Sequence, residues 1–206
     1  MGEEITIGVP EAPACSPADE LAKLASLIRR CRNCDLVLGR HHAVPGEGHP
    51  RATMMFVGEG PGATEDETGR PFVGAAGHFL DELLADIGLR REDVFIANVT
   101  KCRPPGNRDP LPEEIDACHP WLRAQIRIIQ PRVICTLGRF AMHALIDPQL
   151  QISKVHGTPV VRNGILFVPL FHPAAALHQQ SLRNTLIADM RQVREILRER
   201  GLWEGV

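Results

Sequence analysis

Short, continuously apolar segments alternate with segments of helical periodicity along most of the chain. Four apolar runs predict buried strands, at residues 53–57, 94–99, 133–137 and 165–170. Apolar positions at helical spacing predict helices over 16–30, 76–84, 113–129 and 182–200, with a short helix between 138 and 145. Fully apolar strands that alternate with helices are typical of a mostly parallel sheet covered on both faces. The pattern therefore predicts an α/β fold, a three-layer α/β/α sandwich with a central four-stranded sheet.

A helix start marks the boundary of this domain. Ser16 can cap the helix, Pro17 fits its first turn, and Asp19 stands where a capping box needs an acidic residue. Residues 1–15 contain Pro and Glu without periodicity, so we expect a flexible N-terminal tail there and a single domain over 16–206. A chain of 206 residues is long enough for one domain with its own hydrophobic core.

Composition and charge exclude several classes of protein. Hydrophobic residues make up 44% and charged residues 23% of the chain, which is ordinary globular usage and excludes a disordered or coiled-coil protein. No run approaches ~18 consecutive apolar residues, so we expect no membrane-spanning helix. Glu3 and Glu4 stand where a signal peptide needs positive charge, so we expect a cytoplasmic protein. The net charge of −2 provides no global basic field, so any nucleic-acid contact has to come from local patches.

Six cysteines are many for a chain expected in a reducing compartment, where disulfides are disfavoured. Cys31 and Cys34 form a Cys-x2-Cys pair, and Cys102 and Cys118 supply a second pair farther along the chain. Four thiolates suit a tetrahedral zinc ion or an iron–sulfur cluster, and the spacing alone does not distinguish the two. Cys135 lies inside an apolar run and is predicted to be a small buried hydrophobe.

Polar candidates follow the predicted strands, where ligands of parallel sheets bind. The segment GEGPG (58–62) follows the first run, and its glycines would let the backbone approach a flat ligand beside the carboxylate of Glu59. Asn98 ends the second run and offers an acceptor and two donors, and His172 follows the fourth run. Asp66 could either cap a helix or hold the loop. Since no dinucleotide or P-loop motif is present, we expect Glu59, Asn98 and His172 to form a different kind of site at one sheet edge.

Together these segments resemble the family 4 uracil-DNA glycosylases (type a), the iron–sulfur branch of their superfamily. The resemblance rests on GEGPGATEDETGRPFVG (58–74), NVTKCRPPGNRDPLPEE (98–114), the four paired cysteines and FHPAA (171–175), in the same order. It implies a monofunctional hydrolase that flips uracil out of single- or double-stranded DNA and cleaves its N-glycosidic bond. The product would be an abasic site that initiates base excision repair, and the enzyme would be a monomer.

The resemblance also implies roles for individual residues. Phe72 would stack on the flipped uracil, and Asn98 would hydrogen-bond its pyrimidine edge. Accepting from N3–H while donating to O4 would select uracil over cytosine, which presents the reverse pattern. A structural [4Fe-4S] cluster would be held by four thiolates, those of Cys31, Cys34, Cys102 and Cys118.

The hydrolysis itself would need two further kinds of group. His172 would face the base from the opposite wall and stabilise the negative charge that builds on uracil O2. Glu59 and Gly60 would contribute backbone contacts to the base, and a carboxylate, Glu59 or Glu65, would orient the water. The family 1 enzymes carry an aspartate where this chain has Gly60, which leaves the water-orienting group open between those two carboxylates.

Contacts to the DNA backbone are predicted from isolated basic residues. Lys101, Arg103 and Arg108 flank a predicted cluster ligand, and Lys154 lies in a predicted loop, so each is a candidate for phosphate contact or for a solvated surface charge. Leu177 follows the histidine motif and could wedge into the space left by the flipped base or pack in the core.

Three alternatives to a glycosylase remain at this stage. Some relatives trap the sugar covalently through a histidine in an inserted Lys/Arg-rich loop, but residues 98–103 run directly into the cluster ligand without such a loop. A non-catalytic iron–sulfur or zinc DNA-binding module would have no need of Glu59, Asn98 and His172 together. An electron-transfer protein would need a redox-accessible cluster, and the sequence carries no information on this.

Overall fold

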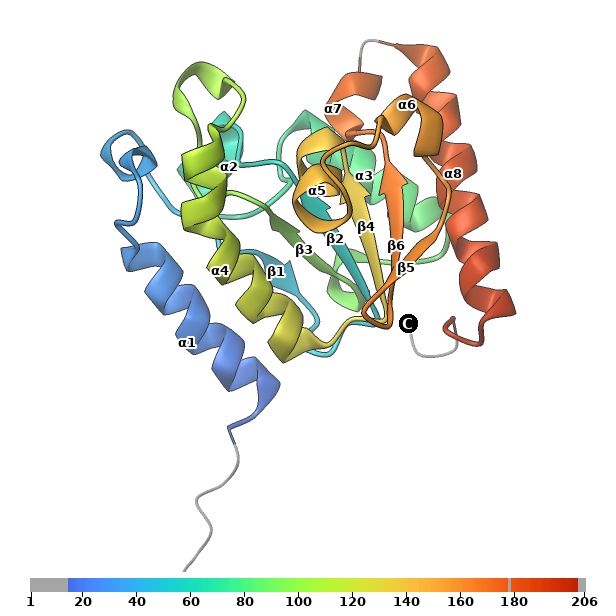
Figure 1. The fold of residues 1–206 in the computed structure, drawn as a ribbon, viewed down its shortest axis with the longest axis horizontal. Coiled ribbons are helices and arrows are strands. Elements are labelled where there is room, and N and C mark those ends of the chain that lie inside the picture. The colour runs from blue at the N-terminus through green and yellow to red at the C-terminus, as the bar shows by residue number, and fades with distance from the viewer. Residues whose placement is uncertain (1–14, 178, 204–206) are drawn as a thin grey trace, which may run out of the picture.

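A six-stranded sheet runs through the computed structural model, which describes residues 15–177 and 179–203 (Figure 1). The strand order is β1-β3-β2-β4-β6-β5. The four inner strands are parallel, and β1 and β5 pair antiparallel at the two edges. The strand bounds are β1 Glu47–Gly48, β2 Met54–Gly58, β3 Phe95–Asn98, β4 Val133–Leu137, β5 Val160–Arg162 and β6 Ile165–Leu170. The α/β class is confirmed.

The prediction of a four-stranded sheet is wrong, because two edge strands were not expected. Strand β1 has only two residues, too few to produce an apolar pattern. Strand β5 turns into β6 through Asn163 and Gly164, which have φ of 49° and 79°. An Asn-Gly pair with positive φ at both positions is the usual signal for a two-residue hairpin, and a search for apolar runs does not detect it.

Helices cover both faces of the sheet and make the three layers (Figure 1). Successive side chains of β2 point to opposite faces of the sheet. Met54 and Phe56 pack with α3 and α8, whereas Met55 and Val57 pack with α4 and α5. The longer helices are α1 Pro17–Arg30, α3 Ala75–Asp86, α4 Pro112–Ile129, α5 Arg139–Leu145 and α8 Gln180–Glu199. The short ones are η1 Asp35–Leu38, α2 Ala63–Thr68, η2 Arg91–Asp93, η3 Pro105–Asn107, α6 Ile152–Val155 and α7 Pro173–Ala176.

The parallel strands bring several loops to one edge of the molecule. The segments that follow β2, β3 and β6 all leave the carboxyl ends of parallel strands in the inner part of the sheet, and they carry α2, η3 and α7. The Ser16 cap predicted for α1 is present as a capping box with Asp19. The predicted tail over residues 1–15 lies outside the described residues, except for the exposed Cys15. Among the described helices, none combines the length and apolarity that crossing a bilayer needs.

Candidate active site and cysteine cluster

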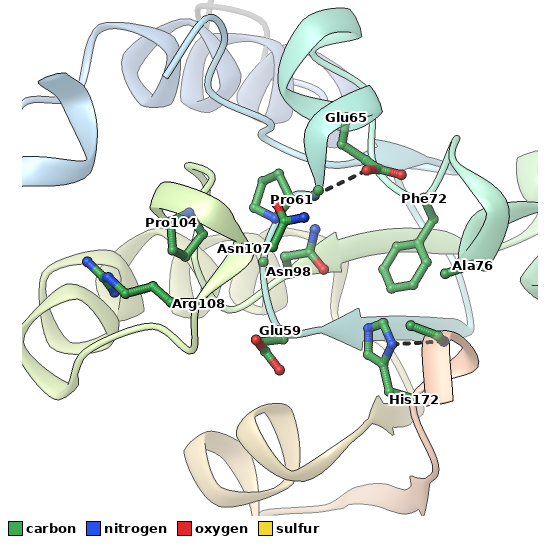
Figure 2. A pocket seen from close by; sticks show the side chains of 13 residues that line it. Glu59, Pro61, Glu65, Phe72, Ala76, Asn98, Pro104, Asn107, Arg108 and His172 are labelled. Carbon is green, nitrogen blue, oxygen red and sulfur yellow. Dashed lines mark hydrogen bonds between the residues drawn. The ribbon is translucent and has the colours of Figure 1, made fainter. Parts of the chain in front are cut away.

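A cleft of about 270 Å³ opens at the carboxyl ends of the strands (Figure 2). It brings together all the non-cysteine residues predicted for the site, which are Glu59, Gly60, Glu65, Phe72, Asn98 and His172. Asn107 and Pro104 also line this cleft and were not predicted from the sequence, although both lie within the segment that carries the family resemblance. Residues that are 113 positions apart in the chain, such as Glu59 and His172, thus line one cavity, because β2 and β6 are parallel and only β4 lies between them in the sheet.

Asn98, at the end of β3, is 1% exposed, and its Oδ1 has no hydrogen-bond partner among the described residues. Its backbone carbonyl accepts a hydrogen bond of 2.8 Å from the ammonium group of Lys101, which fixes the position of the residue. A buried amide oxygen without a partner is unfavourable by about 1–3 kcal/mol, so such an atom in a cleft indicates a ligand that donates to it.

Phe72 forms an aromatic wall next to that amide. Its ring is 5% exposed and stacks on the imidazole of His172, with the ring centroids 5.7 Å apart and the planes 29° from parallel. Gly58 lets the Phe72 ring and the Asn98 amide both approach the end of β2 closely, since a Cβ there would lie 2.5 Å from both the Phe72 Cζ and the Asn98 Oδ1. The cleft therefore has a flat apolar surface directly beside a hydrogen-bonding amide, which suits a planar heterocycle.

His172 caps the N-terminus of α7 and presents one defined tautomer to the cleft. Its Nδ1 accepts a hydrogen bond of 3.1 Å from the backbone N–H of Ala174, so the proton of the neutral ring is on Nε2, which faces the cleft (Figure 2). Burial lowers the pKa of His172 to about 4, against the smaller opposing effect of Glu65. The imidazole is therefore neutral at pH 7, and its Nε2–H is available to donate to a ligand in the cleft.

The two candidate carboxylates differ in what surrounds them. Both oxygens of Glu65 are occupied, since they accept hydrogen bonds from the backbone N–H groups of Gly62, Val73 and Gly74 at 2.8–3.1 Å. The side chain of Glu59 lies half-buried in the cleft, and burial raises the pKa of Glu59, an effect that Asp109 increases and Arg139 opposes. Glu59 is thus the carboxylate whose oxygens are available in the cleft.

The residues predicted to contact DNA differ in how exposed they are and in what they contact. Lys101 is 1% exposed and donates to the Asn98 carbonyl and to Gln125 Oε1, so both interpretations given for it, phosphate contact and solvated charge, are wrong. Arg108 lines the cleft but is paired with Glu114, whereas Lys154 is exposed on α6. Leu177 is 38% exposed, which contradicts core packing and leaves the prediction of a wedge open.

Asp66 and Cys135 are buried, and both have structural roles. Asp66 holds the loop rather than capping a helix, because its carboxylate accepts from the backbone N–H groups of His41 and His42 and contacts the His41 ring. Cys135 is completely buried in β4, as predicted.

The four predicted cluster ligands line one small cavity between α1, the loop after β3 and α4, and they are Cys31, Cys34, Cys102 and Cys118. Three of the sulfurs accept hydrogen bonds: from the Trp121 indole N–H, the Arg40 guanidinium and the Lys101 backbone N–H, at 3.4, 2.9 and 3.2 Å. Among the described residues, no three or more His, Cys, Asp or Glu side chains are arranged to hold a single metal ion. The thiols share a cavity without converging on one point.

A sequence profile of the uracil DNA glycosylase superfamily matches residues 45–197, which include the whole cleft. The chain belongs to the uracil DNA glycosylase superfamily. It is 46% identical to the type-4 uracil-DNA glycosylase of Sulfurisphaera tokodaii over 187 residues. This aligned segment covers 86% of this chain and 85% of that relative. The corresponding enzyme of Thermotoga maritima is 45% identical over 188 residues, or 89% of this chain and 98% of the relative. The resemblance to the type-4 glycosylases is therefore confirmed.

Proposed function

We propose that the chain binds a uracil flipped out of DNA in this cleft and hydrolyses its N-glycosidic bond. The observation that carries the proposal is the buried Asn98 Oδ1 that lacks a partner beside the flat face of Phe72. Uracil N3–H is a donor for that oxygen, and the amide N–H₂ group of Asn98 can donate to uracil O4. Cytosine has an acceptor at N3 and a donor at C4, so it would leave both groups of the amide unpaired.

The neutral His172 stabilises the charge that develops as the bond breaks. Electrons of the glycosidic bond move into the pyrimidine, and negative charge accumulates on O2. The Nε2–H of His172 and the backbone N–H groups near Glu59 are the donors that we assign to this charge. Because the imidazole is neutral at pH 7, it acts as a hydrogen-bond donor and not as a charged acid.

We assign to the Glu59 carboxylate the role of orienting the water that attacks the sugar. Its anion can orient a water toward the sugar carbon and stabilise the cationic character of the sugar in the transition state. We assign to Glu65 the role of positioning the backbone around the cleft. Its carboxylate already accepts hydrogen bonds from three backbone N–H groups of the segments that surround the cleft.

The Glu59→Gln variant should release uracil roughly 100-fold more slowly, because an amide carries no charge to orient the water or stabilise the sugar cation. Wild-type activity should fall as the pH decreases through the raised pKa of Glu59, at a higher pH than expected for an exposed glutamate. This acid limb should be absent in Glu59→Gln and intact in Glu67→Gln, a control on the exposed face of α2. Single-turnover rates from pH 4.5 to 8 test this; an unchanged limb in Glu59→Gln would remove Glu59 from this role.

We also propose that the four cysteines hold a [4Fe-4S] cluster. Each thiolate of such a cluster binds a different iron atom, which suits four sulfurs around one cavity better than a tetrahedral zinc site does. The N–H groups of Trp121, Arg40 and Lys101 would stabilise the thiolate charge. The cluster would supply a structural link that joins α1 and α4 to the loop after β3.

A ligand variant tests that link. Cys34→Ser should abolish the broad absorption band near ~400 nm and lower the free energy of unfolding by at least ~2 kcal/mol, roughly 5 °C or more in Tm. Cys15→Ser, which removes an exposed cysteine away from the cavity, should keep both colour and Tm. A purified wild-type protein that is colourless and contains zinc would contradict the cluster.

The proposed reaction is tested with an oligonucleotide that contains one uracil. We expect free uracil and an alkali-sensitive abasic site in equal amounts, with no effect on the same oligonucleotide carrying cytosine or thymine. Binding without base release would support the non-catalytic module, and an adduct that survives a denaturing gel would support a covalent trap.

We further propose a cytoplasmic monomer, in keeping with six free cysteines; light scattering tests the oligomeric state.

A further inference from the structure

Phe72 has a backbone conformation that its own side chain does not favour. Its φ is +51°, in the left-handed region, which is unfavourable by about 1–2 kcal/mol for a residue with a Cβ. A residue in this conformation keeps it only where the surrounding structure holds it. Since the ring of Phe72 is the proposed stacking surface, whatever holds this backbone also sets the position of the base.

Arg91, in η2, holds the backbone from one side. Its Nη1 donates to the Phe72 carbonyl at 2.9 Å and its Nη2 donates to the Pro71 carbonyl at 2.6 Å. The same guanidinium donates to two carboxylates, Asp81 at 3.0 Å and Glu47 at 2.9 Å. The two carboxylates therefore fix the plane of the guanidinium, and the guanidinium fixes the two consecutive carbonyls.

The backbone is held from the other side by Glu65 and by a close approach of α3. Glu65 Oε1 accepts from the N–H groups of Val73 and Gly74, the two residues that follow Phe72. Gly77 lets α3 pass against the strained residue, because a Cβ there would lie 1.9 Å from the Phe72 carbonyl oxygen. The peptide groups before and after Phe72 thus form hydrogen bonds with side chains from other parts of the chain.

We propose that Arg91 is a positioning residue for the base, which acts by holding the Phe72 ring in its stacking orientation. The inference rests on the proposed function, because it assigns a role in that same cleft. Four bonds in two directions require a planar fork of donors, which arginine has and lysine lacks. Arg91 itself does not line the cleft, so its effect on the base has to pass through Phe72.

A double-mutant cycle tests the route of this effect. Single-turnover rates and KM for uracil release are measured for wild type, Arg91→Ala, Phe72→Ala and the double variant, each well below its Tm. Phe72→Ala should slow release roughly 10- to 100-fold, the usual value of one base–aromatic stack. Arg91→Ala should slow it ~10-fold or more, and the double variant should match Phe72→Ala within ~2-fold. Losses that multiply, or a wild-type rate for Arg91→Ala, would overturn the proposal.

Two further variants separate positioning from general stability. Arg90→Ala, next in sequence and paired among the described residues with the exposed Glu92 and the nearby Asp93, should keep the wild-type rate. Arg91→Lys keeps the positive charge for Glu47 and Asp81, so it should keep most of the Tm, yet it should lose rate as Arg91→Ala does. If Arg91→Ala does not fold, Arg91→Lys takes its place in the cycle; a full rate for Arg91→Lys would overturn the proposal.

A structural readout distinguishes failure of this proposal from failure of the proposed function. In a crystal structure of Arg91→Lys, the Phe72 ring should leave its stacked contact with His172, which has a centroid distance of 5.7 Å in the wild-type chain. An unmoved ring would overturn the positioning role even if wild type releases uracil. A displaced ring in a chain whose wild type releases no uracil would support the positioning of Phe72 and contradict the glycosylase reaction alone.

Discussion

Asn98→Asp should reduce the rate of uracil release roughly 10⁴-fold, the largest effect expected from any single substitution in the cleft. An ionised aspartate only accepts hydrogen bonds, so the donor to uracil O4 is lost and a repulsive oxygen takes its place. The residue is 1% exposed, so water cannot compensate for the mismatch. The measurement is the single-turnover rate on an oligonucleotide with one uracil, together with the Tm of the variant.

A matched control separates recognition from the effect of a new charge. Asn184→Asp makes the same change on the exposed side of α8 and should keep the wild-type rate. A loss of less than ~10-fold in Asn98→Asp, with the protein folded, would show that this amide does not read the edge of the base.

His172→Ala should slow base release by roughly 10²–10³-fold, with a much smaller change in KM, because the Nε2 donor acts on charge that appears only in the transition state. The pKa of His172 is about 4, so the wild-type ring stays neutral from pH 8 to 6. We therefore expect no gain in rate over that range from protonation of this imidazole. Rate measurements under saturating and subsaturating DNA separate the two parameters.

The exposed His78 on α3 provides the control for that substitution. His78→Ala should retain the wild-type rate and pH profile. A His172→Ala variant that loses affinity for the substrate but keeps its maximal rate would mean that the imidazole binds the base uniformly and does not stabilise the departing charge.

Most of the fold could be predicted from the sequence because the four inner strands are buried on both faces. Residues such as Met54 to Val57 are apolar at every position, and this is detectable without tertiary information. The edge strands lack that signal: β1 is too short, and β5 is mostly exposed and depends on the Asn163–Gly164 turn. Predicting β5 would have required the turn chemistry and not hydrophobicity.

The site was predictable where residues lie at the end of a strand or within two residues of it, as Asn98 and His172 do. It was not predictable where a role depends on contacts that are distant in sequence. Lys101 lies in a segment with Arg103 and looks like a surface cation, yet it is buried against Gln125 of α4. Arg91 has no motif around it, and only the fold brings it to the Phe72 carbonyl.

We expect a flipped uracil to lie in the cleft against the Phe72 ring and the Asn98 amide. The most direct test is a crystal structure of the slow Glu59→Gln variant bound to an oligonucleotide with one uracil. We expect this structure to show an extrahelical uracil stacked on the Phe72 ring, with N3–H donating to Asn98 Oδ1 and O2 near His172 Nε2. A uracil that stays in the helix, or that lies elsewhere on the surface with Asn98 Oδ1 still unpaired, would contradict it.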